Sequence, residues 1–205
     1  MTAETAVPLA AAGGGGRGWV LYVAAVVGWL AVVGVFVFGR PFLIGYDAYY
    51  HVQLARVMAE RGLVLESFPW VTDSIWVDGW FDKEWLFHVA LVPFLALGPV
   101  LGAKVFLLCA NVGVAAAFWY LARATGLSRR QAALATAAMP WLCYGIFWMR
   151  LVVCRPHVLS IALLCVGLAL TLRRRPLWLA LVSLVYALAY TGHWQLPAAV
   201  LVYDV

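Results

Sequence analysis

Apolar residues in this chain fall into stretches long enough to cross a membrane, separated by shorter polar segments. Residues 19–38 contain no charged side chain, and a helix needs about 20 residues to cross the hydrocarbon core of a bilayer. Further apolar stretches follow at 105–122, 131–149, 156–172 and 177–190, and another begins before residue 205. The pattern predicts an all-α fold, a polytopic transmembrane helical bundle of about five or six spans.

The apolar segment 85–97 is too short for its length alone to decide whether it crosses. A helix of this length, ended here by Gly98 and Pro99, either spans the membrane, lies at its interface or re-enters it. Arginines cluster at Arg123, Arg129 and Arg130, and again at Arg173, Arg174 and Arg175. If 85–97 does not cross the membrane, both clusters lie in the cytoplasm, where the loops of membrane proteins are enriched in arginine. If 85–97 crosses, both clusters lie outside. We favour the first arrangement, with a cytoplasmic N-terminus.

The polar positions divide the chain into a tail, a loop and a membrane module. Residues 1–18 contain a run of four glycines and predict a flexible cytoplasmic tail. Residues 19–205 form the membrane module, with the first span at 19–38 and an outer loop at 40–84. Seven of the nine acidic residues lie in this loop: Asp47, Glu60, Glu66, Asp73, Asp78, Asp82 and Glu84.

Within the outer loop, residues 47–61 predict an amphipathic helix. Tyr50, Leu54 and Met58 recur at helical spacing on one side. Asp47 is expected to cap the first turn, and Gly62 to end the helix. Aromatic residues around 76–85 predict a second interfacial segment at the headgroups.

The composition excludes a soluble domain and a nucleic-acid-binding protein. Of 205 residues, 66% are hydrophobic and 11% are charged, whereas soluble domains carry about 25% charged residues. The net charge of +5 comes from arginines in short clusters between apolar stretches, which is typical of topology signals rather than of a basic binding face. The lipid bilayer is therefore the partner that the composition supports.

The segment 45–51, Gly-Tyr-Asp-Ala-Tyr-Tyr-His, is the sharpest candidate for chemistry. A carboxylate at the start of a helix just beyond a span can hold a divalent cation where a lipid-linked phosphate would also lie. His51 is one turn further along and shares the helix face with Asp47. The alternative is that Asp47 only caps its helix.

This arrangement, with Asp-x-Tyr-Tyr-His opening the loop after a first span, resembles the catalytic subunits of oligosaccharyltransferases. More broadly it is similar to the GT-C superfamily of membrane glycosyltransferases, which take sugars from polyprenyl-phosphate carriers. The later segment 82–88, Asp-Lys-Glu-Trp-Leu-Phe-His, resembles the motif that closes the loop in related members. The resemblance covers about 20–172 and only the N-terminal module of the longer family chains, so we expect a C-terminally truncated sequence.

The resemblance implies that Asp47 binds the metal, Mn²⁺ or Mg²⁺, and acts in catalysis, with His51 as a further ligand. Asp82 and Glu84 are expected near the same site, or else are solvated loop charges. Glu84 and His88, spaced i and i+4, form either part of a site or an interfacial pair. The family's second acidic position, expected at 150–157, is absent here.

Three cationic or polar side chains occupy that second loop in place of an acid: Arg150, Arg155 and His157. Guanidinium groups bind phosphate through paired hydrogen bonds, and His157 follows Pro156 at a helix start that favours anions. We expect these residues to hold the phosphate of the donor, or His157 to ligate the cation instead. The alternative is that the two arginines anchor the chain to lipid headgroups.

Together these features predict a membrane glycosyltransferase, or the N-terminal part of one, in a bacterial plasma membrane. It would use a polyprenyl-phosphate-linked sugar at the outer face. The competing interpretation is a non-catalytic polytopic protein, either an assembly subunit or a transporter. Transport is the weaker of these, because no charged side chain lies well inside an expected span, where Asn111 is the one amide side chain, and no repeat occurs.

Overall fold

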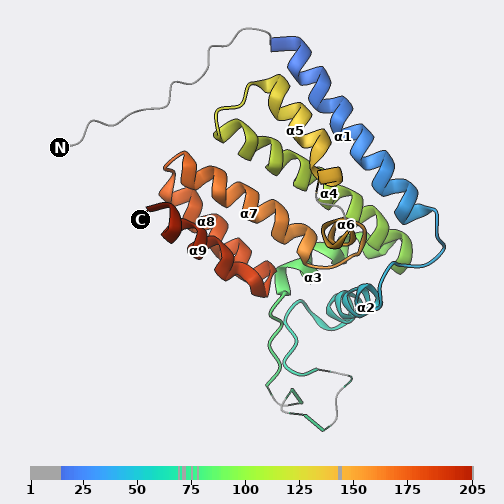
Figure 1. Cartoon of the computed structure of the whole chain (residues 1–205). Coiled ribbons are helices and arrows are strands. Elements are labelled where there is room, and N and C mark those ends of the chain that lie inside the picture. The colour runs from blue at the N-terminus through green and yellow to red at the C-terminus, as the bar shows by residue number, and fades with distance from the viewer. Residues whose placement is uncertain are drawn as a thin grey trace.

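The computed structural model describes residues 15–68, 70, 73–74, 76–77, 79–142 and 145–204, and within them every regular element is a helix (Figure 1). The elements, in chain order, are α1 (Gly15–Phe38), α2 (Tyr46–Arg61), α3 (Trp85–Leu91), the 3₁₀ helix η1 (Val92–Leu97), α4 (Pro99–Ala124), α5 (Arg129–Leu142), α6 (Ile146–Val152), α7 (His157–Leu172), α8 (Pro176–Ala189), the 3₁₀ helix η2 (Thr191–Trp194) and α9 (Gln195–Asp204). The prediction of an all-α fold is confirmed for these residues.

Two of the described helices, α1 and α4, are long and apolar enough to cross a membrane on their own. A third span results if α5 and α6, which are bent by 100° relative to each other, count as one broken span. The other apolar helices, including 85–97, α7 and α8, are shorter. These helices are compatible with an integral membrane protein that has two to three spans by length and composition.

The stretch 131–149, expected as one straight span, is instead broken between α5 and α6. Pro140 lies inside α5 near its end, where a proline removes a backbone hydrogen bond and strains the helix. Gly145 precedes α6 with a φ of 89°, a backbone conformation that glycine adopts without a steric penalty. The two residues together explain why the apolar pattern continues while the helix direction changes.

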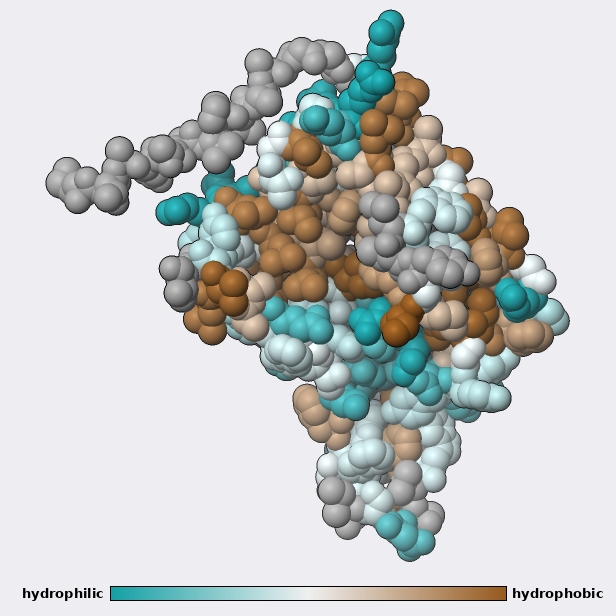
Figure 2. Space-filling model, in the orientation of Figure 1, coloured by the Kyte–Doolittle hydropathy of each residue, from teal (hydrophilic) through white to brown (hydrophobic). Residues whose placement is uncertain are grey.

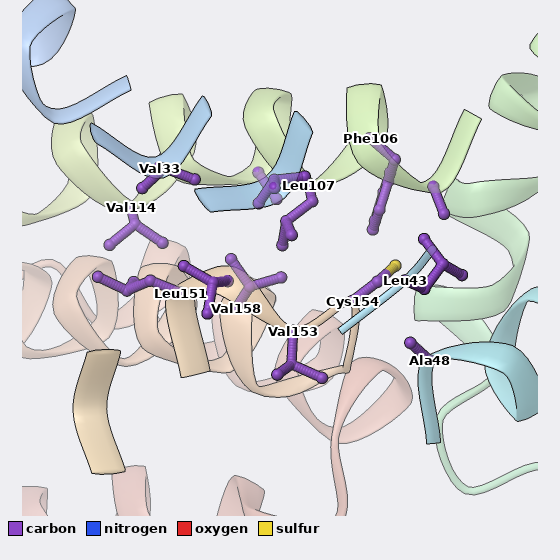
Figure 3. Packing of buried hydrophobic residues seen from close by; sticks show 14 of the residues in the cluster. Val33, Leu43, Ala48, Phe106, Leu107, Val114, Leu151, Val153, Cys154 and Val158 are labelled. Carbon is purple, nitrogen blue, oxygen red and sulfur yellow. The ribbon is translucent and has the colours of Figure 1, made fainter. Parts of the chain in front are cut away.

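Helix α4 is the centre of the bundle. It packs against α7 on one side and against α5 and α1 on the other, and α8 covers α7 (Figure 1). Figure 3 shows the apolar core where α1 and α4 meet the segment from α6 to α7, with Val33, Leu107 and Val114 facing Leu151 and Val158. The buried face of α4 is lined by small residues, among them Ala103 and Ala110, which lets neighbouring backbones approach closely.

A buried asparagine ties three of these helices together. The Asn111 amide nitrogen donates hydrogen bonds to the carbonyl oxygens of Leu107 and Leu151, each at 2.9 Å. The Trp29 indole N–H donates to the Asn111 side-chain oxygen at 3.2 Å. Asn111 is fully buried, so its polar atoms are satisfied by α1, α4 and α6 rather than by a substrate.

The first span begins earlier than expected. Residues 15–18, assigned to the flexible tail, belong to α1, and Gly18 is buried against the start of α5. A Cβ at Gly18 would lie 2.7 Å from that of Arg129, so the helix is held by this contact. The rest of the expected tail, residues 1–14, lies outside the described residues, as does Asp78 of the loop acids.

Helix α2 spans Tyr46–Arg61 and ends at Gly62, close to the prediction. It buries Leu54, Ala55 and Met58 and leaves an ion pair between Arg56 and Glu60 exposed, which confirms an amphipathic helix. The expected cap is wrong, because Gly45 occupies the cap position and no side chain caps the first turn. Asp47 lies inside the first turn, where its carboxylate is free to pair elsewhere.

The turn between α1 and α2 is fixed by two close contacts. The buried ammonium of Lys104 in α4 donates a hydrogen bond to the carbonyl oxygen of Arg40. Gly45 has a φ of 82°, and a Cβ there would lie 3.1 Å from Cγ1 of Val153. The turn therefore rests directly on the segment between α6 and α7, as Leu43, Ala48 and Val153 in Figure 3 illustrate.

Candidate functional site

Polar side chains from three separate segments gather at one end of the bundle. The segments are α2, the approach to α3, and the link between α6 and α7. In Figure 2 hydrophilic colour concentrates where the apolar bundle meets α2 and the outer loop. Most of the residues expected to act in chemistry lie in these three segments.

A chain of hydrogen bonds runs from Asp82 through His88 to His51. The Asp82 Oδ2 lies 2.6 Å from Nδ1 of His88, and the Nε2 of His88 lies 2.8 Å from Nδ1 of His51. Both histidines are buried, with His88 fully enclosed. Asp82 also accepts a hydrogen bond from the Glu84 backbone N–H through Oδ1 at 3.0 Å, which fixes the turn that starts α3.

The tautomers of the two histidines follow from these partners. Since a carboxylate only accepts hydrogen bonds, Asp82 selects the His88 tautomer that carries its proton on Nδ1. The Nε2 of a neutral His88 is then an acceptor, and the proton between the two rings belongs to Nδ1 of His51. The lone pair of His51 is left on its Nε2.

Glu84 completes a compact group with the two histidines. The Oε2 atom of Glu84 lies 4.0 Å from Nδ1 of His51, and the Glu84 side chain is only 14% exposed. One ligand atom from each of His51, Glu84 and His88 falls within 4.8 Å of the others. These three side chains have the composition and proximity of a metal-ligand set.

Burial disfavours charge at this group. It lowers the pKa of the His51 imidazole from 6.5 to about 3, with the charges of His88 and Arg155 acting in the same direction. Burial also raises the pKa of Glu84, against the opposing effect of His88. His51 is therefore neutral at physiological pH, which is the form in which an imidazole binds a cation.

Aromatic rings cover the same group. The Tyr50 ring lies 5.1 Å from that of His51 and 6.2 Å from that of Phe68, measured between centroids. Burial, followed by the charges of Asp82 and Glu84, raises the pKa of the Tyr50 phenol to about 12. Tyr50 therefore stays protonated and can donate a hydrogen bond, but it cannot act as a base near neutral pH.

Asp47 forms an ion pair with Arg155, on the other side of the site. The Arg155 Nη2 donates to Asp47 Oδ2, so the start of α2 is joined to the link between α6 and α7. The Asp47 side chain is 51% exposed and the Arg155 side chain is 42% exposed, so both remain accessible to a ligand at the surface. The Nε of Arg155 is enclosed and has no hydrogen-bond partner among the described residues.

The remaining predicted phosphate ligands flank this ion pair. Arg150 is exposed in the last turn of α6. His157 is the first residue of α7, with its ring 5.1 Å from that of Tyr190. Asp47, Arg150 and Arg155 are all close enough to His157 to act on it electrostatically.

The structure groups the predicted residues differently from the sequence pattern. Asp47 and His51 were expected to share a cation, but His51 contacts His88 and Asp47 contacts Arg155. His88 had been noted only for its spacing from Glu84. The His51–His88 contact left no signal in the sequence, because it depends on how α2 packs against α3.

Comparison with protein-family models, curated proteins and solved structures found no match to this chain. The function of this chain is therefore inferred from the geometry of the site. That geometry combines a cationic surface, an exposed carboxylate and a buried group of histidines and acids.

Proposed function

We propose that this chain is a membrane glycosyltransferase, or the N-terminal part of one, that uses a polyprenyl-phosphate-linked sugar at the outer membrane face. The observation that carries the proposal is the Asp47–Arg155 ion pair. It joins the acid that opens the first loop to the guanidinium of the later loop. The residues proposed as base and as phosphate ligand are thereby side by side at one end of the bundle.

Arg155 has the chemistry to bind the donor phosphate, with Arg150 and His157 beside it. A guanidinium pairs with phosphate through two parallel hydrogen bonds, and its charge stabilises the phosphate as it leaves the sugar. Because the ion pair is about half exposed, a phosphate can compete with Asp47 for Arg155 at little cost.

Asp47, once released from Arg155, has the chemistry of a general base for the acceptor. In the proposed reaction the acceptor oxygen bonds to the sugar's anomeric carbon, and the bond from that carbon to the donor phosphate breaks. The acceptor proton passes to Asp47, and polyprenyl phosphate leaves with the electron pair. Asp82 and Glu84, which are largely buried beside His88 and His51, are proposed to support a divalent cation that would neutralise the leaving phosphate.

The same proposal includes an arrangement in the membrane. We propose five or six spans, with α7 and α8 inserted beside α1 and α4, and a bacterial plasma membrane with the N-terminus in the cytoplasm. The arginines at 123, 129, 130 and 173–175 then lie inside, and the acidic loop lies outside. The apolar helices and the arginine distribution support this orientation.

Binding of polyprenyl phosphate by the purified chain in nanodiscs tests the proposal. We expect tighter binding of polyprenyl phosphate than of uncharged polyprenol, and we expect Arg155→Gln to abolish this preference. Arg56→Gln is the matched control, since Arg56 is exposed on α2 and pairs, within the part of the chain that the structure describes, with the exposed Glu60. It removes the same charge from the same end of the protein.

Release of labelled sugar from a polyprenyl-phosphate donor provides the second readout, and it should fall with Asp47→Asn while donor binding persists. Equal binding of the phosphate and the alcohol by a folded wild type would contradict the proposal. The non-catalytic interpretation, an assembly subunit or a transporter, would then be preferred.

A further inference from the structure

We propose that His51, Glu84 and His88 form a zinc-binding site, in which Asp82 holds His88 in the tautomer that ligates. The inference goes beyond the transferase proposal, because zinc binding does not depend on a sugar donor or on transfer activity. It also names a ligand set that differs from the Asp47 and His51 pair expected from the sequence.

The geometry of the two rings supports a cation between them. Their facing nitrogens are 2.8 Å apart, and two nitrogens bound to a tetrahedral Zn²⁺ at its usual distances are about 3.3 Å apart. The hydrogen-bonded pair therefore needs to open by about half an ångström. Zn²⁺ would replace the shared proton, which moves to the Nε2 of His51.

The environment of His88 is that of a metal ligand. Zinc-bound histidines usually donate their other N–H to a carboxylate, which fixes the ring and makes it more basic. Asp82 accepts from Nδ1 of His88 at 2.6 Å, and this leaves Nε2 aimed at His51 and Glu84. Asp82 is itself 7% exposed and held by the Glu84 N–H, so the orientation is fixed before any ion binds.

The balance of charge also suits a divalent ion. Glu84 and Asp82 are the two acids of the group, and imidazoles that bind a metal are neutral and add no charge. Arg155, a cation close enough to act on His51, has its own charge compensated by Asp47. A group that buries two acids beside neutral histidines is stabilised when a 2+ ion joins it.

The ligand types select zinc over the magnesium or manganese expected from the sequence. Imidazole nitrogens suit Zn²⁺, whereas Mg²⁺ and Mn²⁺ prefer sets of oxygen ligands. Three protein ligands leave a fourth tetrahedral position for water or for a phosphate oxygen, as in catalytic zinc sites.

The test is equilibrium Zn²⁺ binding by the full chain, purified in detergent through a tag that contains no histidine. We expect one Zn²⁺ to bind per chain, and excess Mn²⁺ should not displace it. Co²⁺ bound in place of Zn²⁺ should show the visible absorption of a four-coordinate ion. Loss of a residue that only hydrogen-bonds to a metal ligand weakens metal binding by about 10–100-fold. His51→Gln and Glu84→Gln each remove a ligand itself, so each should weaken zinc binding by more than this.

Two further variants separate this site from the alternatives. Asp82→Asn should weaken binding by about 10–100-fold, since it removes the carboxylate partner of a ligand. Asp47→Asn should weaken zinc binding far less than Glu84→Gln does, because it removes no ligand and only the carboxylate that compensates Arg155, whereas a site built on Asp47 and His51 would lose zinc binding. Circular dichroism and thermal unfolding confirm that each variant is folded. If the folded wild type binds Zn²⁺ no better than the folded Glu84→Gln variant, or if Asp47→Asn alone abolishes binding, the proposed site is wrong.

Discussion

The Nδ1 of His51 lies 2.8 Å from the Nε2 of His88, although 37 residues separate the two histidines. The contact joins the helix that opens the outer loop to the helix that closes it. Asp82 extends it into a three-residue chain of hydrogen bonds that is almost entirely buried. These hydrogen bonds hold the two ends of the outer loop together and account for several testable properties of the loop.

Asp82→Asn should destabilise the protein by about 1–3 kcal/mol, because it exchanges a charge-assisted hydrogen bond to a buried histidine for a weaker neutral one. The measurement is thermal unfolding in detergent with a chelator present. Glu60→Gln serves as the control, since its exposed pair with Arg56 contributes at most about 1 kcal/mol. Equal melting temperatures for the two variants would show that the buried chain contributes no more than a surface ion pair.

His51 should make the protein sensitive to acid. Its pKa is about 3 in the folded protein and 6.5 ordinarily, so the unfolded chain binds more protons between these values. The free energy of unfolding attributable to His51 is complete above pH 6.5 and decreases as the pH falls toward 3. The contribution of Glu84 to stability changes with pH in the opposite direction. Its pKa is raised in the folded protein, so just above pH 4.5 the folded chain binds more protons than the unfolded chain.

The two contributions can be separated by working in a Glu84→Gln background. In that background, unfolding measured between pH 7 and pH 4 should show a loss of stability on acidification. Adding His51→Gln should flatten the curve over this range. A slope that persists unchanged in the double variant would assign the acid sensitivity to other groups.

Gly45→Ala should destabilise the protein by more than Gly62→Ala does. Both glycines have positive φ, 82° and 112°, and a side chain in such a conformation costs about 1–3 kcal/mol. A Cβ at Gly45 would also press on Val153 at 3.1 Å, while no atom lies within 4 Å at Gly62. Chemical or thermal unfolding of the two variants isolates the effect of that contact, and equal losses would mean that Val153 yields freely.

Asn111→Leu should destabilise the helical bundle by about 1–3 kcal/mol, since it leaves the buried Trp29 indole N–H and the Leu151 carbonyl without their partner. Asn111 makes hydrogen bonds to both. Val112→Leu, at an exposed neighbouring position of α4, is the control for a leucine in this helix. The tryptophan fluorescence of a Trp29-only background should shift with the first variant and not with the second.

Local features of the fold could be predicted because they depend on short-range patterns. The apolar stretch 19–38 lies within α1, and the amphipathic spacing after Asp47 gave α2 to within one residue of its observed start. Gly62 ends α2 as a glycine with positive φ commonly does. The break in 131–149 was missed, because hydropathy records composition and not the direction of the helix axis.

The candidate site was predictable in its members and not in its pairings. Asp47, Asp82, Glu84 and Arg155 all lie at the same end of the bundle, and their residue types and loop positions signalled this. Which acid pairs with which base depends on long-range packing, chiefly of α2 on α3 and of Gly45 on Val153. No spacing along the chain encodes these contacts.

The two halves of the site have different places in the order of synthesis. His51, Asp82, Glu84 and His88 all lie between α1 and the end of α3, so their contacts are available to a nascent chain before α4 is complete. Arg155 follows α6 and reaches Asp47 only after the link to α7 has settled on Gly45. A ribosome-bound intermediate would therefore already contain every residue of the histidine group while Asp47 still lacked its partner, and Arg155 would join the site last.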